Sequence, residues 1–176
     1  MKSQKKIAVI YKSKYGATKQ YAEWIAETLN APVFEASSIK PPQLAEYDVI
    51  IYGGGVYAGS INGVKLVSKS DCKKLVVFSV GLEDPKTVDL SKFLTNTFTA
   101  QQLSSTKIFH LRGASDYRKL NFVHKGIIAM LKKSAEKKPI AERTSIDNGV
   151  LSMYDTEVSL VDKTEIAPIV EYVGSL

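Results

Sequence analysis

The chain has 176 residues, of which 44% are hydrophobic and 24% charged, and this composition is typical of one globular domain with a buried core. Its single cysteine, Cys72, excludes an intrachain disulfide and a cysteine-held zinc or iron–sulfur site. The basic start Met1–Lys6 is followed by only five apolar residues, too few for a signal peptide, and no run of about 18 apolar residues indicates a membrane span. We therefore expect a single domain, residues 1–176, in the cytoplasm.

The formal net charge of +6 is concentrated in one segment. Between Arg118 and Lys138 seven basic residues stand against one acid, Glu136, and in the rest of the chain acids and bases cancel. A local excess of this kind favours contact with an anionic partner.

Apolar runs alternate along the chain with segments of helical periodicity. The predicted strands are Lys6–Tyr11, Val33–Ala36, Asp48–Tyr52, Leu75–Val80 and Lys107–Leu111. The predicted helices are Thr18–Leu29, Val88–Leu103, Leu120–Ala135 and a last one that opens at a capping box, Asp162 with Glu165. Pro168 predicts a kink in that last helix or a later start.

This alternation predicts an α/β protein, a three-layer sandwich in which right-handed crossovers join parallel strands. Ligands of such sheets bind at the carboxyl ends of the strands. Three loops meet there, residues 12–18, 53–62 and 79–87.

The first of these loops has the features of a phosphate site. Its expected binding residues are Ser13, Lys14, Tyr15, Gly16, Ala17 and Thr18. They lie between a strand and a helix, where backbone N–H groups and the helix dipole favour an anion. The motif resembles the phosphate loop of flavodoxins, which holds the phosphate of FMN. The resemblance implies noncovalent FMN and a flavodoxin-like, five-stranded parallel sheet of order 2-1-3-4-5.

The other two loops supply candidates for contact with the flavin ring. Glycines in the second loop permit close backbone approach, and Tyr57 is the candidate for stacking on the ring, although it also suits a tyrosine that merely covers a loop. The expected cofactor-binding residues are Gly54, Gly55, Val56, Tyr57, Ala58 and Gly59 in the second loop, and Ser79, Val80, Gly81 and Leu82 in the third.

Other nucleotide folds lack their defining residues here. A dinucleotide fingerprint requires G-x-G-x-x-G after the first strand, where only Gly16 stands, and a Walker A motif is absent. A receiver domain requires magnesium-binding acids where Tyr11 and Lys12 stand. Of the two histidines, His110 favours a structural role in a strand, and His124 falls in the basic helix as a weak candidate proton donor.

A basic helical insertion of about residues 113–155 precedes the last helix. At helical spacing one arc is apolar, and it contains Leu120, Val123, Ile127, Met130 and Leu131. The other arc is basic, with Phe122 among its cations. The helix therefore suits either packing on the domain through its apolar arc or docking on an anionic membrane surface or acidic partner. Nucleic acid is disfavoured, because stacking aromatics do not interleave with the cations.

Phe78-Ser79-Val80, and Leu111-Arg112-Gly113-Ala114 ahead of the basic helix, extend the resemblance to one branch of the superfamily. They are similar to the flavodoxin-like, oxygen-independent protoporphyrinogen oxidases. The resemblance implies an FMN-dependent dehydrogenase that oxidises a porphyrinogen and passes electrons to quinone, at the inner face of the membrane. The candidate residues for docking substrate or membrane are Arg112, Arg118, Lys119, Phe122, Lys125, Lys132 and Lys133.

The alternative is a flavodoxin-type shuttle that exchanges electrons with a redox partner protein and has no substrate of its own. Such shuttles tend to be acidic around the flavin, and the local charge of the insertion counts against that role. The insertion is also poorer in arginine and aromatic residues than in the oxidase branch, and it carries an extra polar segment, Ile140–Gly149.

Overall fold

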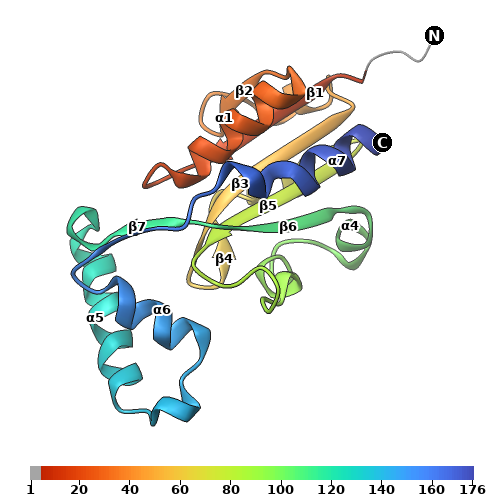
Figure 1. Cartoon of the computed structure of the whole chain (residues 1–176). Coiled ribbons are helices and arrows are strands. Elements are labelled where there is room, and N and C mark those ends of the chain that lie inside the picture. Colours follow the sequence, from red (N-terminus) through yellow and green to blue (C-terminus); the bar gives the residue numbers. More distant parts are fainter. Residues whose placement is uncertain (1–4) are drawn as a thin grey trace.

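A computed structural model describes residues 5–176, so the first four residues of the basic start lie outside the described residues. A parallel sheet forms its centre, with the strand order β2-β1-β3-β5-β6 (Figure 1). These strands are β1 Ile7–Lys12, β2 Val33–Glu35, β3 Val49–Tyr57, β5 Leu75–Gly81 and β6 Lys107–Arg112. The predicted α/β fold and its order of five parallel strands are confirmed.

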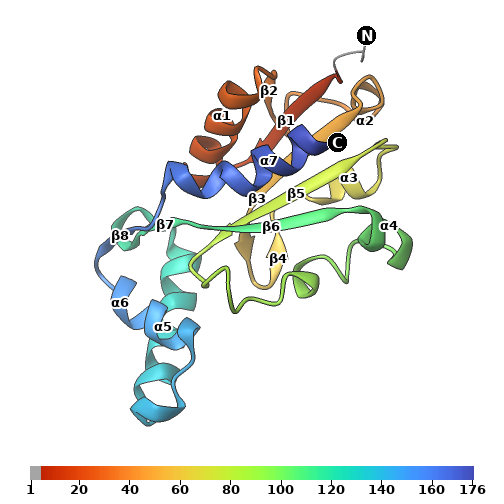
Figure 2. The same ribbon diagram turned by 45° about the vertical axis from the view of Figure 1, so that its right-hand side comes forward.

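Helices cover both faces of this sheet because its central strands are apolar on both sides. One face packs against α1 Ala17–Leu29 and α7 Ala167–Ser175, and the other against α2 Pro41–Leu44, α3 Lys65–Ser68 and α4 Ala100–Ser105 (Figures 1 and 2). Successive residues of β1 illustrate the alternation. Ala8 is buried beneath α2 and α3, and Val9 is buried beneath α1.

The glycine-rich segment after residue 52 is strand, not the loop that the sequence predicts. β3 continues to Tyr57, and β4, Ser60–Ile61, pairs with it antiparallel. The turn between them, Ala58-Gly59, has positive φ at both residues (48° and 73°), as two-residue hairpin turns require. Gly54 is needed here because a Cβ would lie 2.6 Å from the backbone oxygen of Asn62.

The helix predicted over Val88–Leu103 is wrong. A 3-10 turn spans Leu90–Phe93, and α4 begins only at Ala100. Thr99 starts this new helix, because its hydroxyl accepts from the N–H of Gln102 (3.2 Å) while Gln102 Oε1 accepts from the N–H of Thr99 (2.9 Å).

The insertion forms a small unit that projects from the carboxyl edge of the sheet (Figures 1 and 2). Its elements are β7 Ala114–Asp116, α5 Phe122–Glu136, α6 Ser145–Met153 and β8 Glu157–Ser159. β7 and β8 pair antiparallel, and α5 packs against α6. The sequence predicts α5 within two residues at its start, but it does not predict β7, β8 or α6.

The last helix starts late, one of the two outcomes that Pro168 predicts. Asp162 Oδ1 accepts from the N–H of Thr164 (2.8 Å) and opens a 3-10 turn, after which α7 begins at Ala167. The second half of the predicted capping box is wrong, because the Glu165 carboxylate accepts instead from the N–H of Arg112 (2.9 Å).

Candidate functional site

The loop between β1 and α1 leaves the amino end of a 13-residue helix open. Gly16 is its N-cap, with a φ of 101° that favours glycine, and no side chain caps the first turn. Ser13 Oγ accepts from the N–H of Gly16 (3.0 Å), and Thr18 is buried in the first turn of the helix. No acidic residue lies in that turn, so the free N–H groups and the dipole favour an anion here.

Tyr57, at the end of β3, lies beside this loop. Its ring centroid is 6.4 Å from that of Tyr15, and the rings meet edge to face. Partial burial raises the pKa of Tyr57 to about 12. The structure therefore brings Tyr57 next to the predicted phosphate loop.

A third ring joins them from the insertion. Nδ1 of His124, on α5, lies 2.6 Å from the hydroxyl of Tyr15, and its ring stacks on Tyr57 with centroids 5.4 Å apart. Lys14 Nζ lies 3.4 Å from His124 Nε2, and partial burial together with this cation lowers the pKa of His124. Sequence reasoning did not place His124 in the site, since it lies more than a hundred residues beyond the loop.

The other predicted binding residues of the second loop form the end of β3 and the turn that joins it to β4. Gly54 and Gly55 are buried in β3, and the carbonyl of Gly55 accepts from the N–H of Asn62 (2.9 Å). Val56 is half-buried, and Ala58 and Gly59 are exposed at the turn. Their predicted contact with a cofactor stays a prediction.

The third loop begins in the sheet and turns out at its edge. Ser79 Oγ lies 2.7 Å from Nδ1 of His110, and both side chains are buried, as is Val80. The carbonyl of Gly81 accepts from the N–H of Gly113 (2.7 Å), and Leu82 is half-buried. Within residues 5–176, Nε2 of His110 has no hydrogen-bond partner, and burial lowers the pKa of this imidazole.

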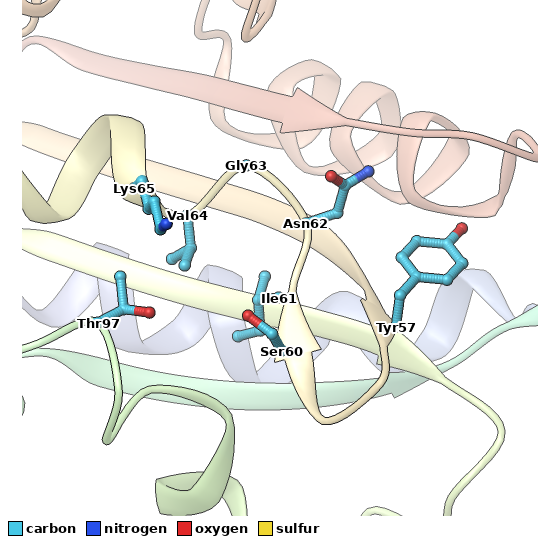
Figure 3. A pocket seen from close by; sticks show the side chains of 8 residues that line it. All are labelled: Tyr57, Ser60, Ile61, Asn62, Gly63, Val64, Lys65 and Thr97. Carbon is cyan, nitrogen blue, oxygen red and sulfur yellow. The ribbon is translucent and has the colours of Figure 1, made fainter.

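A pocket of about 280 Å³ lies along the β4 hairpin and runs from Tyr57 toward Thr97 (Figure 3). Its lining residues are Tyr57, Ser60, Ile61, Asn62, Gly63, Val64, Lys65 and Thr97. Figure 3 shows Tyr57 and Asn62 at one end and Lys65 near the other. Tyr57 is the one predicted site residue in this lining. No residue of the first or third loop lines the pocket, so it is not where the three loops meet.

The predicted docking residues spread over two places. Arg112 ends β6, and its Nε is buried without a partner in the described part of the chain. Arg118 Nε and Lys119 Nζ lie 3.2 and 3.4 Å from the Asp116 carboxylate, and Arg118 Nη2 lies 3.6 Å from the Glu157 carboxylate.

The other docking candidates lie along α5. Lys132 Nζ pairs with Glu136 (2.9 Å) and lies 4.4 Å from the Tyr154 ring centroid. Lys125 lies over the ring of Tyr117, and Lys133 is exposed.

The apolar arc of the basic helix is largely exposed, so of the two alternatives that the sequence leaves open, packing on the domain fails for most members of the arc. Of the five residues, Leu120 alone is buried. The other four are exposed by 64% (Val123), 45% (Ile127), 66% (Met130) and 38% (Leu131). Phe122, on the basic arc, is 92% exposed. α5 contacts α6, and Ala135 is the one buried residue of α5, so the apolar face is largely uncovered. Within residues 5–176 no helix is long and apolar enough to cross a bilayer.

Comparison with known proteins adds one strong match. Residues 8–141, more than half of the chain, match the family model described as a flavodoxin domain. No curated protein matches the chain.

Several solved structures are similar at low identity. A putative flavoprotein from Bacteroides eggerthii is 14% identical, with a TM-score of 0.48 over 73% of this chain and 96% of its own. A Lactobacillus acidophilus flavoprotein in complex with FMN is 16% identical, with a TM-score of 0.41 over 62% and 93%. Oxidised Flavodoxin 2 from Bacillus cereus is 20% identical, with a TM-score of 0.41 over 61% and 85%. The family match alone carries the assignment that follows.

Proposed function

This chain belongs to the flavodoxin domain family, and we propose that it binds FMN noncovalently and transfers electrons through it. The observation that carries the proposal is the open amino end of α1. Gly16 has nothing within 4 Å of the place where a Cβ would stand, and no side chain caps the helix. These features fit a terminal phosphate.

In this proposal, bound FMN supplies the redox chemistry, and the protein binds and orients it. Ser13 and Thr18 offer hydroxyl donors beside the backbone N–H groups of α1, and Lys14 offers a cation. Tyr57 provides the stacking surface for the ring, and the third loop closes the other side of the site.

We further propose that the electrons come from an anionic tetrapyrrole substrate of the porphyrinogen type and pass to a quinone. The cations at the start of the insertion, Arg112, Arg118 and Lys119, support this, because guanidinium and ammonium groups bind carboxylates. The Nε of Arg112 is buried without a partner among residues 5–176, so a carboxylate bound there would satisfy it.

The exposed face of α5 supports docking on an anionic membrane surface, where quinones dissolve. The side chains of Phe122 and Met130 are exposed to solvent on a helix that also carries Lys125 and Lys133. Basic amphipathic helices with exposed aromatic residues bind anionic lipid in this way.

The first experiment identifies the cofactor by chromatography of the flavin that heating releases from purified protein. FMN is expected, and recovery of FAD alone, or a protein that added FMN never turns yellow, would overturn the proposal.

The second experiment mixes the FMN-loaded protein anaerobically with protoporphyrinogen and a menaquinone analogue. Porphyrin fluorescence above the rate without protein is expected. Its absence, together with reversible one-electron reduction, would instead identify a shuttle that serves a redox partner protein.

A further inference from the structure

Three aromatic rings from three distant segments meet beside the phosphate loop. Tyr15 comes from the loop, Tyr57 from the end of β3 and His124 from the first turn of α5. Each ring contacts the other two, with centroids between 5.4 and 6.4 Å apart. We call these residues the three-ring cluster.

The cluster leaves no space for a further ring on the stacked face of Tyr57. The planes of His124 and Tyr57 are inclined by only 22°, so the imidazole covers the phenol ring face to face. A ring placed between them needs a contact distance of about 3.5 Å on each side, or about 7 Å in total. The observed centroid distance of 5.4 Å is too short.

We infer that the His124 imidazole occupies the ring position of the proposed flavin site, so that an aromatic ligand stacks on Tyr57 only after the first turn of α5 moves away. His124 is thus a specificity-determining residue that opposes ring binding and leaves phosphate binding untouched. The inference rests on the proposed FMN site, and it assigns to the insertion control over entry of the ring.

The contacts that hold His124 are few enough to be exchanged for a ligand. They are one hydrogen bond to Tyr15, one stacked pair with Tyr57 and one contact with Lys14. The apolar residues of α5 are largely exposed and do not pack on the sheet, so they do not hold His124 against Tyr57.

The test compares flavin affinities of the flavin-free protein by fluorescence quenching. His124→Ala removes the imidazole and keeps the backbone N–H that Asn121 caps (2.8 Å). The variant is expected to bind FMN and riboflavin about tenfold more tightly, because it no longer breaks a hydrogen bond and a stacked pair. Riboflavin lacks the phosphate, so an equal gain for both ligands assigns the effect to the ring.

Two further variants serve as controls. His124→Phe keeps a stacking ring without the hydrogen bond to Tyr15, and a smaller gain is expected. Ser134→Ala changes an exposed residue of the same helix, away from the cluster, and unchanged affinity is expected.

A second readout follows amide hydrogen exchange in α5. FMN is expected to accelerate exchange in the first turn of the helix in the wild-type protein, because the ligand displaces His124. Weaker or unchanged flavin binding by His124→Ala, or slower exchange with FMN, would overturn the inference and leave the proposed function standing. If neither the wild-type protein nor any variant binds FMN, the proposed function itself fails.

Discussion

The hydroxyl of Tyr21, on α1, donates a 2.7 Å hydrogen bond to the carbonyl oxygen of Arg112 at the end of β6. The Tyr21 hydroxyl oxygen in turn accepts from the N–H of Asp162 (3.1 Å), just after β8. One phenol therefore ties the helix behind the phosphate loop to the two points where the insertion leaves and rejoins the sheet. Its pKa is raised to about 12, mainly by burial.

Replacing Tyr21 by Phe should destabilise the protein by about 1–3 kcal/mol, because it leaves the Arg112 carbonyl and the Asp162 N–H without a partner. Urea denaturation measures the loss. Tyr172→Phe, which removes a hydroxyl from half-buried Tyr172 on α7, is the matched control and should change stability by less than about 0.5 kcal/mol. Equal midpoints for both variants would contradict the prediction.

Thr18→Val tests the phosphate site with almost no change in shape. The loss of one hydroxyl donor should weaken FMN binding by about 1–3 kcal/mol. Riboflavin titrated into the same variant should bind as it does to the wild-type protein, since it has no phosphate. Equal losses for both ligands would show that the variant disturbs the fold instead.

His110 should make stability fall in mild acid. Burial lowers the pKa of its imidazole, so below about pH 6.5 the unfolded chain takes up a proton that the folded chain does not. The contribution of the neutral His110 imidazole to stability is therefore fully present above its pKa in the unfolded chain. It declines as the pH falls toward its pKa in the folded chain, by up to about 1.4 kcal/mol per pH unit. Denaturant melts at several pH values give the unfolding free energy as a function of pH. For His110→Gln this free energy should fall less steeply with acidification than for the wild-type protein. An imidazole signal that titrates at the ordinary value in NMR would rule this out.

Asp147 of α6 forms an ion pair with Lys138, just after the end of α5. Its carboxylate accepts from Lys138 Nζ (2.8 Å) and from the N–H and hydroxyl of Thr144 (2.8 and 2.9 Å). These bonds, that of Lys138 first, lower its pKa to about 2. The stabilising charge is present above the unfolded pKa near 4 and is lost as the pH falls toward about 2.

Lys138→Met should raise the pKa of Asp147 toward its ordinary value. Lys137→Met, at the exposed neighbouring lysine, should leave it unchanged. The NMR shift of the carboxyl carbon reports both, and an identical titration in the two variants would refute the role of Lys138.

The membrane proposal predicts that the protein binds vesicles containing anionic lipid at low ionic strength. Replacing Lys125, Lys132 and Lys133 by Glu should weaken this binding on the order of a hundredfold, at about 1 kcal/mol per cation lost. FMN affinity should stay the same. Wild-type protein that ignores such vesicles would end the membrane proposal.

Two controls separate the charge from the apolar face. Replacing Lys40, Lys69 and Lys86 by Glu changes the net charge by the same amount at exposed positions away from α5. This variant should keep most of the vesicle binding. Phe122→Ser keeps every cation and should still weaken binding, because it removes a ring that is 92% exposed.

The sequence was sufficient for the five parallel strands and for the turn into α1 because both depend on local pattern. Continuous apolar runs predict strands that are buried on both faces, and alternation with helices leaves few topologies. Gly16 marks the left-handed turn into α1 without reference to anything else in the chain. The late start of α7 follows in the same way from the ring of Pro168.

Tertiary contacts decided the rest. The glycines after residue 52 predict a loop, but they continue β3 because they pair with strands on both sides, with Gly54 opposite Lys12 of β1 and Ser79 of β5. The apolar arc of α5 has the period of a packed helix, and period alone does not say whether anything covers it. His124 reaches the cluster because the folded insertion brings the first turn of α5 beside Tyr15. A contact between residues more than a hundred positions apart leaves no signal in one sequence, so the ring position that His124 fills was decided by the fold.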